Sequence, residues 1–315
     1  MNLINQETKK IIQEYGSTKK ELLINMFKHI ERCARTCYKS EDKITDKSYI
    51  KMIHNLIANK HFAMLEFGTM YFEVPNSNIN CDILKLSCGS KFIKWKINNI
   101  TDTIFITTNY RYYLESKILK YFIKYICSPT KDHEKRYTYK FTTNRAIANE
   151  LVRHRVFSFS QESTRYCNYS IGKYDGLTFI IPSYLHKMLE GYYKCTEYWD
   201  YGNIEMTIYY SPILVENLTD DKYELKSDYF VMRETLKSFE NAENIYKELL
   251  KQSNFECTRK LLPQEVRDIL PLAVKTEICM CGFESDWDRL YDVRVKGITG
   301  TPHPMIKELI SKIKK

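Results

Sequence analysis

The chain has 315 residues, of which 43% are hydrophobic and 28% are charged, as is ordinary for a globular protein with a sizeable core. Lys and Arg outnumber Asp and Glu by 48 to 39, and the resulting net charge of +9 favours anionic partners such as nucleotides, nucleic acid or an anionic membrane surface. No apolar run approaches the roughly 18 residues of a membrane span, which excludes a transmembrane helix.

The first half of the chain predicts two helices followed by strands. Apolar side chains recur at helical spacing over 22–37 and again over 50–58. The segment 69–74 predicts a strand that Pro75 ends. Between 78 and 118 we expect β structure, including 103–113, then a helix over 116–126 and an alternating strand over 136–142.

The second half predicts mainly helices. They are expected over 144–155, over the long amphipathic stretch 227–250, after Pro263 and over 274–291, with a short buried strand at 178–182. Helices and antiparallel-type strands come in blocks, so we predict an α+β fold, and the absence of a Gly-x-Gly-x-x-Gly motif argues against a Rossmann domain. Because no Pro/Gly/Ser-rich linker divides the chain, we predict a single domain over 1–315.

The ten cysteines do not form a metal-ligand framework of paired short spacings, so we predict no metal site. The N-terminal residues lack the apolar core of a signal peptide, so a cytoplasmic protein with reduced thiols is expected. Cys279 and Cys281 are two positions apart, and we interpret both as core residues on the expected helix.

The densest group of anion-binding residues follows the predicted helix 144–155. Arg153, His154 and Arg155 are consecutive, and Ser163 and Arg165 follow. Guanidinium groups offer planar pairs of donors that match phosphate and carboxylate oxygens. The alternative is a helix that ends in cations, which favour the negative end of its dipole.

This stretch resembles the signature of the flavin-dependent thymidylate synthases (the ThyX family), which is Arg-His-Arg, seven residues, then Ser. Three blocks are similar to the family in the same order: about 30–74, 144–182 and 262–309, roughly half of the chain. The segments 78–140 and 187–255 do not align, and we interpret them as variable insertions within the single domain.

The resemblance implies an enzyme that converts dUMP to dTMP. It would use 5,10-methylenetetrahydrofolate as carbon donor, FAD as hydride carrier and NADPH as reductant. A homotetramer with sites shared between subunits is implied as well, and Arg153 and Arg155, which cannot share one helix face, would then serve different ligands or subunits.

The resemblance also assigns residues. The residues that would contact the flavin are His61, Ala63, Arg153, His154, Arg155, Gln161, Phe283, Ser285, Arg289 and His303. The residues that would contact dUMP are Glu150, Leu151, Val152, Arg153, Gln161, Glu162, Ser163, Thr164, Arg165, Arg267 and Arg294. Arg294 is the expected catalytic residue, because a guanidinium that stays charged can hold the negative charge of an ionised uracil.

Several positions depart from the family pattern. Ala63 replaces a hydroxyl residue, Phe67 a histidine, and Phe283 and Arg289 stand where some members have asparagine. One alternative is therefore a relative that binds FAD but has lost methyl transfer. A second alternative, a single-strand nucleic-acid-binding protein, is suggested by the charge and 25 tyrosines, but the basic residues and tyrosines are scattered.

For several individual residues, a purely structural role is the alternative to a role in the site. Ser163 is expected to bind rather than attack, because no Ser-His-Asp pattern surrounds it. Cys167 lies outside the signature and is interpreted as structural. His61 and His303 could instead be satisfied histidines without a ligand, and Arg267 could form a surface ion pair.

Overall fold

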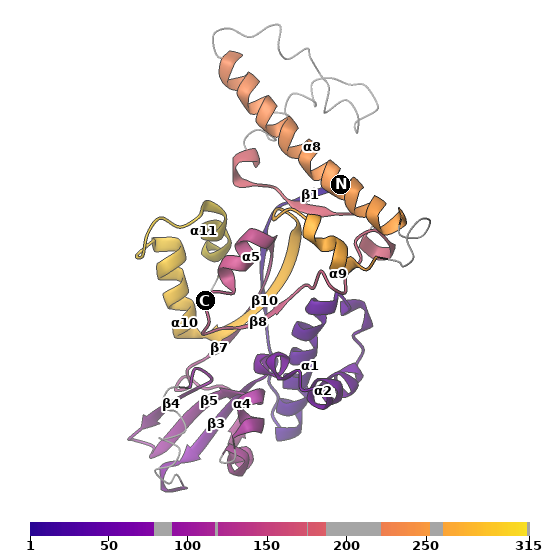
Figure 1. The fold of residues 1–315 in the computed structure, drawn as a ribbon. Coiled ribbons are helices and arrows are strands. Elements are labelled where there is room, and N and C mark those ends of the chain that lie inside the picture. The colour runs from indigo at the N-terminus through magenta and orange to yellow at the C-terminus, as the bar shows by residue number, and fades with distance from the viewer. Residues whose placement is uncertain (79–89, 117–118, 175, 187–221, 253–260, 314–315) are drawn as a thin grey trace. The chain divides into compact units, whose positions relative to one another are not determined.

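The computed structural model describes residues 1–78, 90–116, 119–174, 176–186, 222–252 and 261–313 (Figure 1). The chain divides into two compact units. The first unit comprises 1–6, 144–146 and 164–275, and the second comprises 7–143, 147–163 and 276–315. Of the two segments interpreted as insertions, residues 79–89, 117–118, 187–221 and 253–255 lie outside the described residues.

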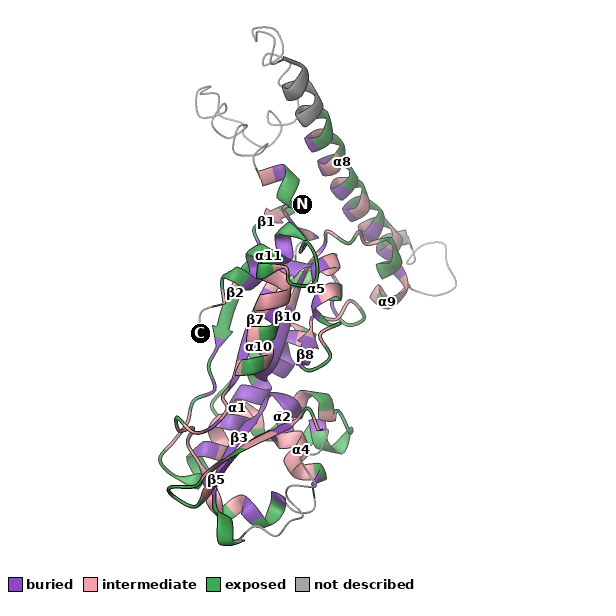
Figure 2. Cartoon of the chain, turned by 90° about the vertical axis from the view of Figure 1, so that its left-hand side faces the viewer, coloured by how far each residue is buried: buried purple, intermediate pink, exposed green. Residues whose placement is uncertain are grey.

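The second unit contains a four-stranded sheet with the strand order β2-β7-β10-β8. Its strands are β2 (Glu7–Ile11), β7 (Arg136–Asn144), β10 (Lys275–Phe283) and β8 (Ser158–Gln161). β8 runs antiparallel to β10, with Phe159 opposite Met280. Most positions of the two inner strands β7 and β10 are buried (Figure 2).

The predicted helix over 274–291 is wrong in its first half. Residues Lys275–Phe283 form the strand β10, and only Glu284–Tyr291 form the helix α10. Cys279 and Cys281 are both buried, as expected, but on this strand. An inner strand is covered on both faces, so its apolar run does not alternate and cannot be distinguished from a buried helix by periodicity.

A second sheet of the same unit is fully antiparallel and has the strand order β4-β5-β3-β6. Its strands are β4 (Ile93–Asn98), β5 (Thr103–Asn109), β3 (Thr69–Pro75) and β6 (Ile126–Cys127). The strand expected over 103–113 ends early because the side chain of Asn109 accepts a hydrogen bond from the Tyr112 backbone N and caps the helix α4 (Tyr110–Glu115). The helix expected over 116–126 is a 3₁₀ helix at Leu119–Tyr125.

The helix α1 (Lys19–Tyr38) supplies much of the core of this unit. It begins with a capping box in which Thr18 and Glu21 exchange side-chain to backbone hydrogen bonds. Its buried face includes Met26, Ile30 and Cys33. The other helices of this unit are α2 (Ser48–Ala58), a 3₁₀ helix (Phe62–Phe67), α5 (Arg145–Leu151, which starts in the first unit), α10, a π-helical turn (Asp292–Lys296) and α11 (Pro304–Ser311), with short 3₁₀ turns at Glu41–Lys43 and Asn76–Asn78.

The first unit combines a parallel strand pair with a long helix. β1 (Asn2–Ile4) pairs with β9 (Thr178–Ile180), and Phe179 stacks on Phe239 of α8 (Lys222–Gln252) with ring centroids 4.4 Å apart. Cys167 is buried in this core, which fits the structural role expected for it. The unit also holds α9 (Pro263–Val266) and 3₁₀ turns at Gly172–Tyr174, Ser183–Leu185 and Arg267–Ile269.

The predicted α+β class with antiparallel strands is confirmed. Among the helices of the described residues, none is both long and apolar enough to cross a membrane.

Candidate active site

The Arg153–Arg155 segment lies in a tight turn and not in a helix. α5 ends at Leu151, four residues before the predicted end. The backbone N of His154 donates to Leu151 O at 3.0 Å, and the backbone N of Phe157 donates to His154 O at 3.1 Å. Arg153 and Arg155 are exposed, and their side chains form no hydrogen bond or ion pair with the described residues. The turn therefore presents two guanidinium groups that are available to an anion.

Phe157 anchors the end of this turn. Its ring lies edge-on to Trp287 of α10, with centroids 4.6 Å apart, and it packs against Gly282 of β10. A Cβ atom on Gly282 would lie only 2.3 Å from Cδ1 of Phe157. Glycine is therefore required at this position if the aromatic ring is to sit directly on the sheet.

Beyond Phe157 the signature continues as the edge strand β8. Ser160 Oγ donates to Cys33 O at 2.8 Å, and the backbone N of Ser163 donates to Cys37 O at 2.9 Å, so both residues are tied to α1. Glu162 is buried, and its carboxylate accepts a hydrogen bond from the backbone N of Glu277 at 3.2 Å. Gln161 Nε2 donates to Thr276 Oγ1 at 3.3 Å. These contacts hold the second half of the signature against β10 and α1.

Arg294 reaches this turn from the π-helical turn Asp292–Lys296. Its Nε donates to Nε2 of His154 at 3.0 Å, and its Nη1 donates to Oε2 of Glu150 at 2.9 Å. Nη2 makes no hydrogen bond to the described residues. The structure thus brings together Glu150, His154 and Arg294, three residues that the sequence analysis had assigned to the site. Nη2 of Arg294 is left to donate to a ligand.

His154 serves Arg294 as a neutral acceptor. Burial, together with the positive charge of Arg294, lowers the pKa of His154 to about 4. Because Nε2 accepts from Arg294, the single proton of the neutral ring lies on Nδ1.

Charged side chains surround two of the expected flavin contacts: Lys94 from β4, Glu134 from the stretch before β7, and Arg136 from β7. Phe283 is buried, with Lys94 Nζ 4.6 Å and the Arg136 guanidinium 5.4 Å from its ring centroid. Ser285 Oγ accepts a hydrogen bond from Lys94, and the backbone N of Ser285 donates to Glu134 Oε1 at 3.1 Å. Lys94 and Glu134 come from the segment 78–140, which the sequence analysis interpreted as an insertion.

The other expected flavin contacts differ in their surroundings. His61, Ala63 and Arg289 are exposed. Nδ1 of His303 accepts a hydrogen bond from the backbone N of Met305 at 3.2 Å and so caps α11. This cap gives His303 a structural role, although Nε2 stays available.

Three of the expected dUMP contacts, Thr164, Arg165 and Arg267, belong to the first unit. The Arg165 guanidinium lies 5.6 Å from the ring centroid of Tyr166, and Arg267 Nε lies 3.9 Å from Asp268 Oδ1. The same unit contains Arg145, whose Nε and Nη2 are buried without a hydrogen-bond partner among the described residues. Because unpaired buried donors are costly, Arg145 is suited to an anionic ligand.

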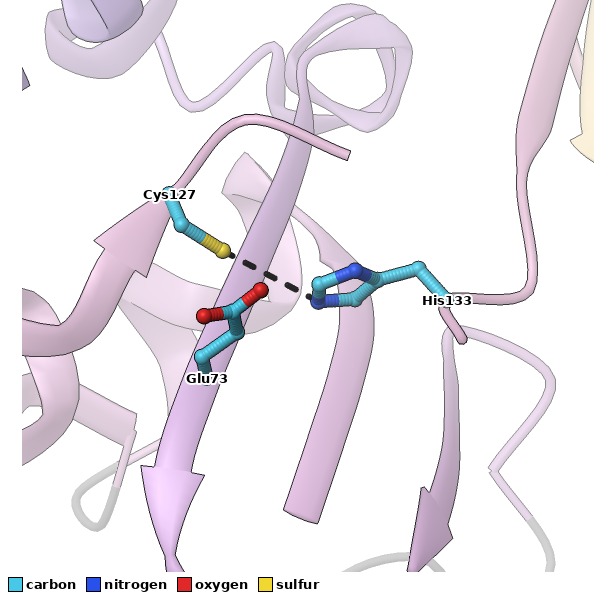
Figure 3. A group of neighbouring side chains, drawn as sticks. All are labelled: Glu73, Cys127 and His133. Carbon is cyan, nitrogen blue, oxygen red and sulfur yellow. Dashed lines mark hydrogen bonds between the residues drawn. The ribbon is translucent and has the colours of Figure 1, made fainter. Parts of the chain in front are cut away.

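One further group has the residue types of a metal site. Glu73, Cys127 and His133 converge, and their potential ligand atoms all lie within 4.8 Å of one another (Figure 3). However, Nδ1 of His133 accepts from the backbone N of Thr130 at 3.1 Å, so the ring proton lies on Nε2, which donates to Phe72 O at 3.1 Å. Burial and the charge of Glu73 raise the pKa of the Cys127 thiol to about 12. We interpret the group as a hydrogen-bonded cluster.

Residues 90–297 match the sequence model of the Thy1 family, described as thymidylate synthase complementing protein. The chain belongs to this family. The match covers well over half of the chain, includes the signature turn and Arg294, and confirms the resemblance inferred from the motif.

Solved structures that this chain matches include two proteins with nucleotide ligands. One is the UMP/dUMP methylase PolB from Streptomyces cacaoi bound with 5-Br dUMP, with 12% identity and a TM-score of 0.39 over 99% of this chain and 90% of that one. The other is thymidylate synthase X from Helicobacter pylori with FAD and dUMP, with 16% identity and a TM-score of 0.32 over 56% of this chain and 64% of that one. No curated protein matches this chain by sequence. Membership of the Thy1 family rests on the sequence model.

Several residues of this Thy1 chain had no role in the sequence analysis. Glu66 was recognised only as part of the family-like block of about 30–74, and Arg145 only as part of a predicted helix. Ser158 lies inside the signature but at a position that the motif leaves open. The signal at Glu66 was a carboxylate between Leu65 and Phe67, since a charge inside an apolar run is buried only when it is paired.

Proposed function

We propose that the chain is a flavin-dependent thymidylate synthase that converts dUMP to dTMP. In this proposal 5,10-methylenetetrahydrofolate donates the carbon, FAD carries the hydride and NADPH is the reductant. The observation that supports it most is the pair of hydrogen bonds that orients Arg294 beside the Arg153–Arg155 turn in a Thy1-family chain.

The role of Arg294 follows from its partners. Two of its guanidinium nitrogens are held by Glu150 and His154, so Nη2 is presented in a defined direction. A fixed cation stabilises the negative charge that develops on the uracil ring when N3 ionises, and the ionised ring is more nucleophilic at C5. Because His154 stays neutral at pH 7, it does not compete with Arg294 for that charge.

The cations of the chain fit ligands that carry phosphates. Arg153 and Arg155 have exposed side chains that pair with none of the described residues, and Arg145 has buried donors without a partner in the same part of the chain. We propose that Arg153 and Arg155 hold FAD, and that Arg145 joins Thr164, Arg165 and Arg267 in holding the dUMP phosphate. When bound and reduced by NADPH, FAD would supply the hydride that completes the new methyl group, since no side chain can.

The remaining parts of the proposal follow from the family. They are a homotetramer with sites shared between subunits, action in the cytoplasm and no binding of nucleic acid. The substituted positions Ala63, Phe67, Phe283 and Arg289 make loss of methyl transfer the main rival.

The deciding experiment measures tritium release from dUMP labelled at C5. The reaction is run anaerobically with methylenetetrahydrofolate and NADPH, with and without added FAD. Release that depends on FAD supports the proposal, and equal release without flavin contradicts it. A preparation that binds FAD and oxidises NADPH but releases no tritium would identify the rival, a relative without methyl transfer.

A further inference from the structure

Glu66 connects the signature strand to the segment 78–140. It is buried at the end of the 3₁₀ helix Phe62–Phe67, with 7% of its surface exposed. Its Oε2 accepts a hydrogen bond from Ser158 Oγ at 2.6 Å, and its Oε1 accepts one from Arg111 Nη1 at 2.7 Å. One buried carboxylate is therefore shared between the first residue of β8 and the helix α4.

The backbone of Glu66 is held in place by a hydrogen bond as well. Nη1 of Arg136 donates to the carbonyl oxygen of Glu66 at 3.1 Å. Arg111 is fixed in turn by a second carboxylate, because its Nε donates to Glu115 Oε1 at 2.9 Å. Hydrogen bonds between charged partners are short and strong when water is partly excluded, so this chain of contacts defines the place of Ser158.

A second contact from the same segment reaches the turn itself. Lys91 Nζ donates to the carbonyl oxygen of Arg155 at 2.6 Å. The segment 78–140 therefore contacts the signature at Arg155 through Lys91, and at Ser158 through Arg111 and Glu66. Between these two points lies the end of the turn that carries Arg153 and Arg155.

We propose that the Arg111–Glu66 ion pair is a positioning device for the Arg153–Arg155 turn, and that Lys91 and the helix α4 are thereby part of the ligand-binding apparatus. This inference rests on the proposed function for the identity of the ligand, FAD. Arg111 and Glu66 hold the turn in the shape that binds the cofactor. They act through Ser158 and do not themselves touch the reacting atoms.

The test compares Arg111→Met with Glu115→Gln. Arg111→Met removes the guanidinium and leaves Glu66 without its cation, whereas Glu115→Gln removes only the charge of the second carboxylate and leaves the Arg111–Glu66 pair in place. In Arg111→Met we expect the dissociation constant of FAD to rise about tenfold, as for loss of one charge-assisted hydrogen bond, while kcat at saturating FAD stays within about twofold. In Glu115→Gln both quantities stay within about twofold, and Arg111→Lys recovers part of the lost affinity.

Hydrogen exchange of the ligand-free protein separates this inference from the proposed function. Peptides that cover 153–163 exchange faster in Arg111→Met than in the wild type or in Glu115→Gln, whatever the ligand of the turn. Unchanged exchange in a folded Arg111→Met variant, or a FAD affinity within twofold of a FAD-binding wild type, overturns the positioning role. If Arg111→Met fails to fold, Ser158→Ala takes its place with the same expected results. If Arg111→Met exchanges faster as expected but the wild type does not bind FAD, the proposed function is refuted and the positioning role stays intact.

Discussion

Nε of Arg294 donates a hydrogen bond to Nε2 of His154 over 3.0 Å, although 140 positions separate the two residues in the chain. The contact fixes the tautomer of the histidine and the direction of the guanidinium at once. His154 had been expected to line the flavin. Its observed partner gives it a second role, as the acceptor that orients the proposed activator.

Replacing Arg294 tests the activator directly. We expect Arg294→Ala to fold and to bind FAD but to lose about 100-fold or more in kcat, as for removal of one donor that stabilises a developing anion. The matched control is Lys296→Met, an exposed cation of the same π-helical turn, which should stay within about twofold. Turnover of Arg294→Ala within about threefold of the wild type would show that another group activates the uracil.

The partner of Arg294 can be tested by comparing two substitutions at Glu150. Glu150→Gln keeps an oxygen that accepts from Nη1, so we expect kcat to fall less than about fivefold. Glu150→Ala removes the acceptor and should cost about tenfold or more. Equal rates in both variants, measured by tritium release from dUMP, would mean that the ion pair does not orient Arg294.

The low pKa of His154 predicts an acid limb of activity. A protonated ring cannot accept from Arg294, so kcat/KM should fall as the pH drops toward about 4, the value to which burial and Arg294 lower the pKa. In His154→Gln, whose amide oxygen accepts at every pH, this limb should disappear. An unchanged limb in that variant would assign it to a different group.

The lowered pKa of His154 also predicts that the protein becomes less stable as the pH falls. The unfolded imidazole titrates near its ordinary value of 6.5 and the folded one near 4, so the unfolded chain binds more protons between these values. The contribution of His154 to stability is therefore present above about pH 6.5 and is lost as the pH falls through about 4. Urea unfolding at pH 7 and pH 4.5 should show a smaller loss in His154→Gln than in the wild type.

Gly282→Ala should disturb both the core and the turn. The added Cβ would lie 2.3 Å from Cδ1 of Phe157, so we expect destabilisation by about 1–3 kcal/mol and weaker ligand binding at the turn. Phe157→Leu in the same chain creates space and should restore part of the stability. Urea unfolding of the single and double variants measures this coupling, and strictly additive losses would show that Phe157 is not the obstacle.

The hydrogen-bonded state of His133 predicts that Zn²⁺ has little effect. Because both ring nitrogens already have partners, adding Zn²⁺ to EDTA-treated protein should shift the Tm by less than about 1 °C. His133→Gln should lower stability with or without metal. A Cd²⁺–thiolate absorption band that is lost in Cys127→Ser would instead establish a metal site.

Local sequence patterns were sufficient to predict several helices and to identify the family. The amphipathic repeat over 227–250 lies within α8 (Lys222–Gln252), and the capped repeat over 22–37 lies within α1 (Lys19–Tyr38). Such patterns depend on neighbours three and four residues away, so the sequence carries them directly. The Arg153–Ser163 motif was equally local, and the Thy1 match confirmed the family that it indicated.

The same local rules failed where two structures share one pattern. The apolar run 278–281 suits a buried strand as well as a buried helix, and only its pairing with β8 and β7 determines which one forms. The turn at Arg153–Arg155 continued a helical repeat in sequence, yet the helix ends at Leu151, where the chain turns to place Phe157 on Gly282.

By itself, the sequence determined which chemical groups this protein has and the family to which it belongs, because a motif is a statement about residues close together in the chain. Only the tertiary structure decided that Arg294 meets His154 and Glu150, and that Glu66 joins Ser158 to Arg111. These distances depend on strand register and on packing between segments that are 45 to 144 residues apart. No local spacing encodes such contacts, because their geometry exists only once the sheets and helices have packed together.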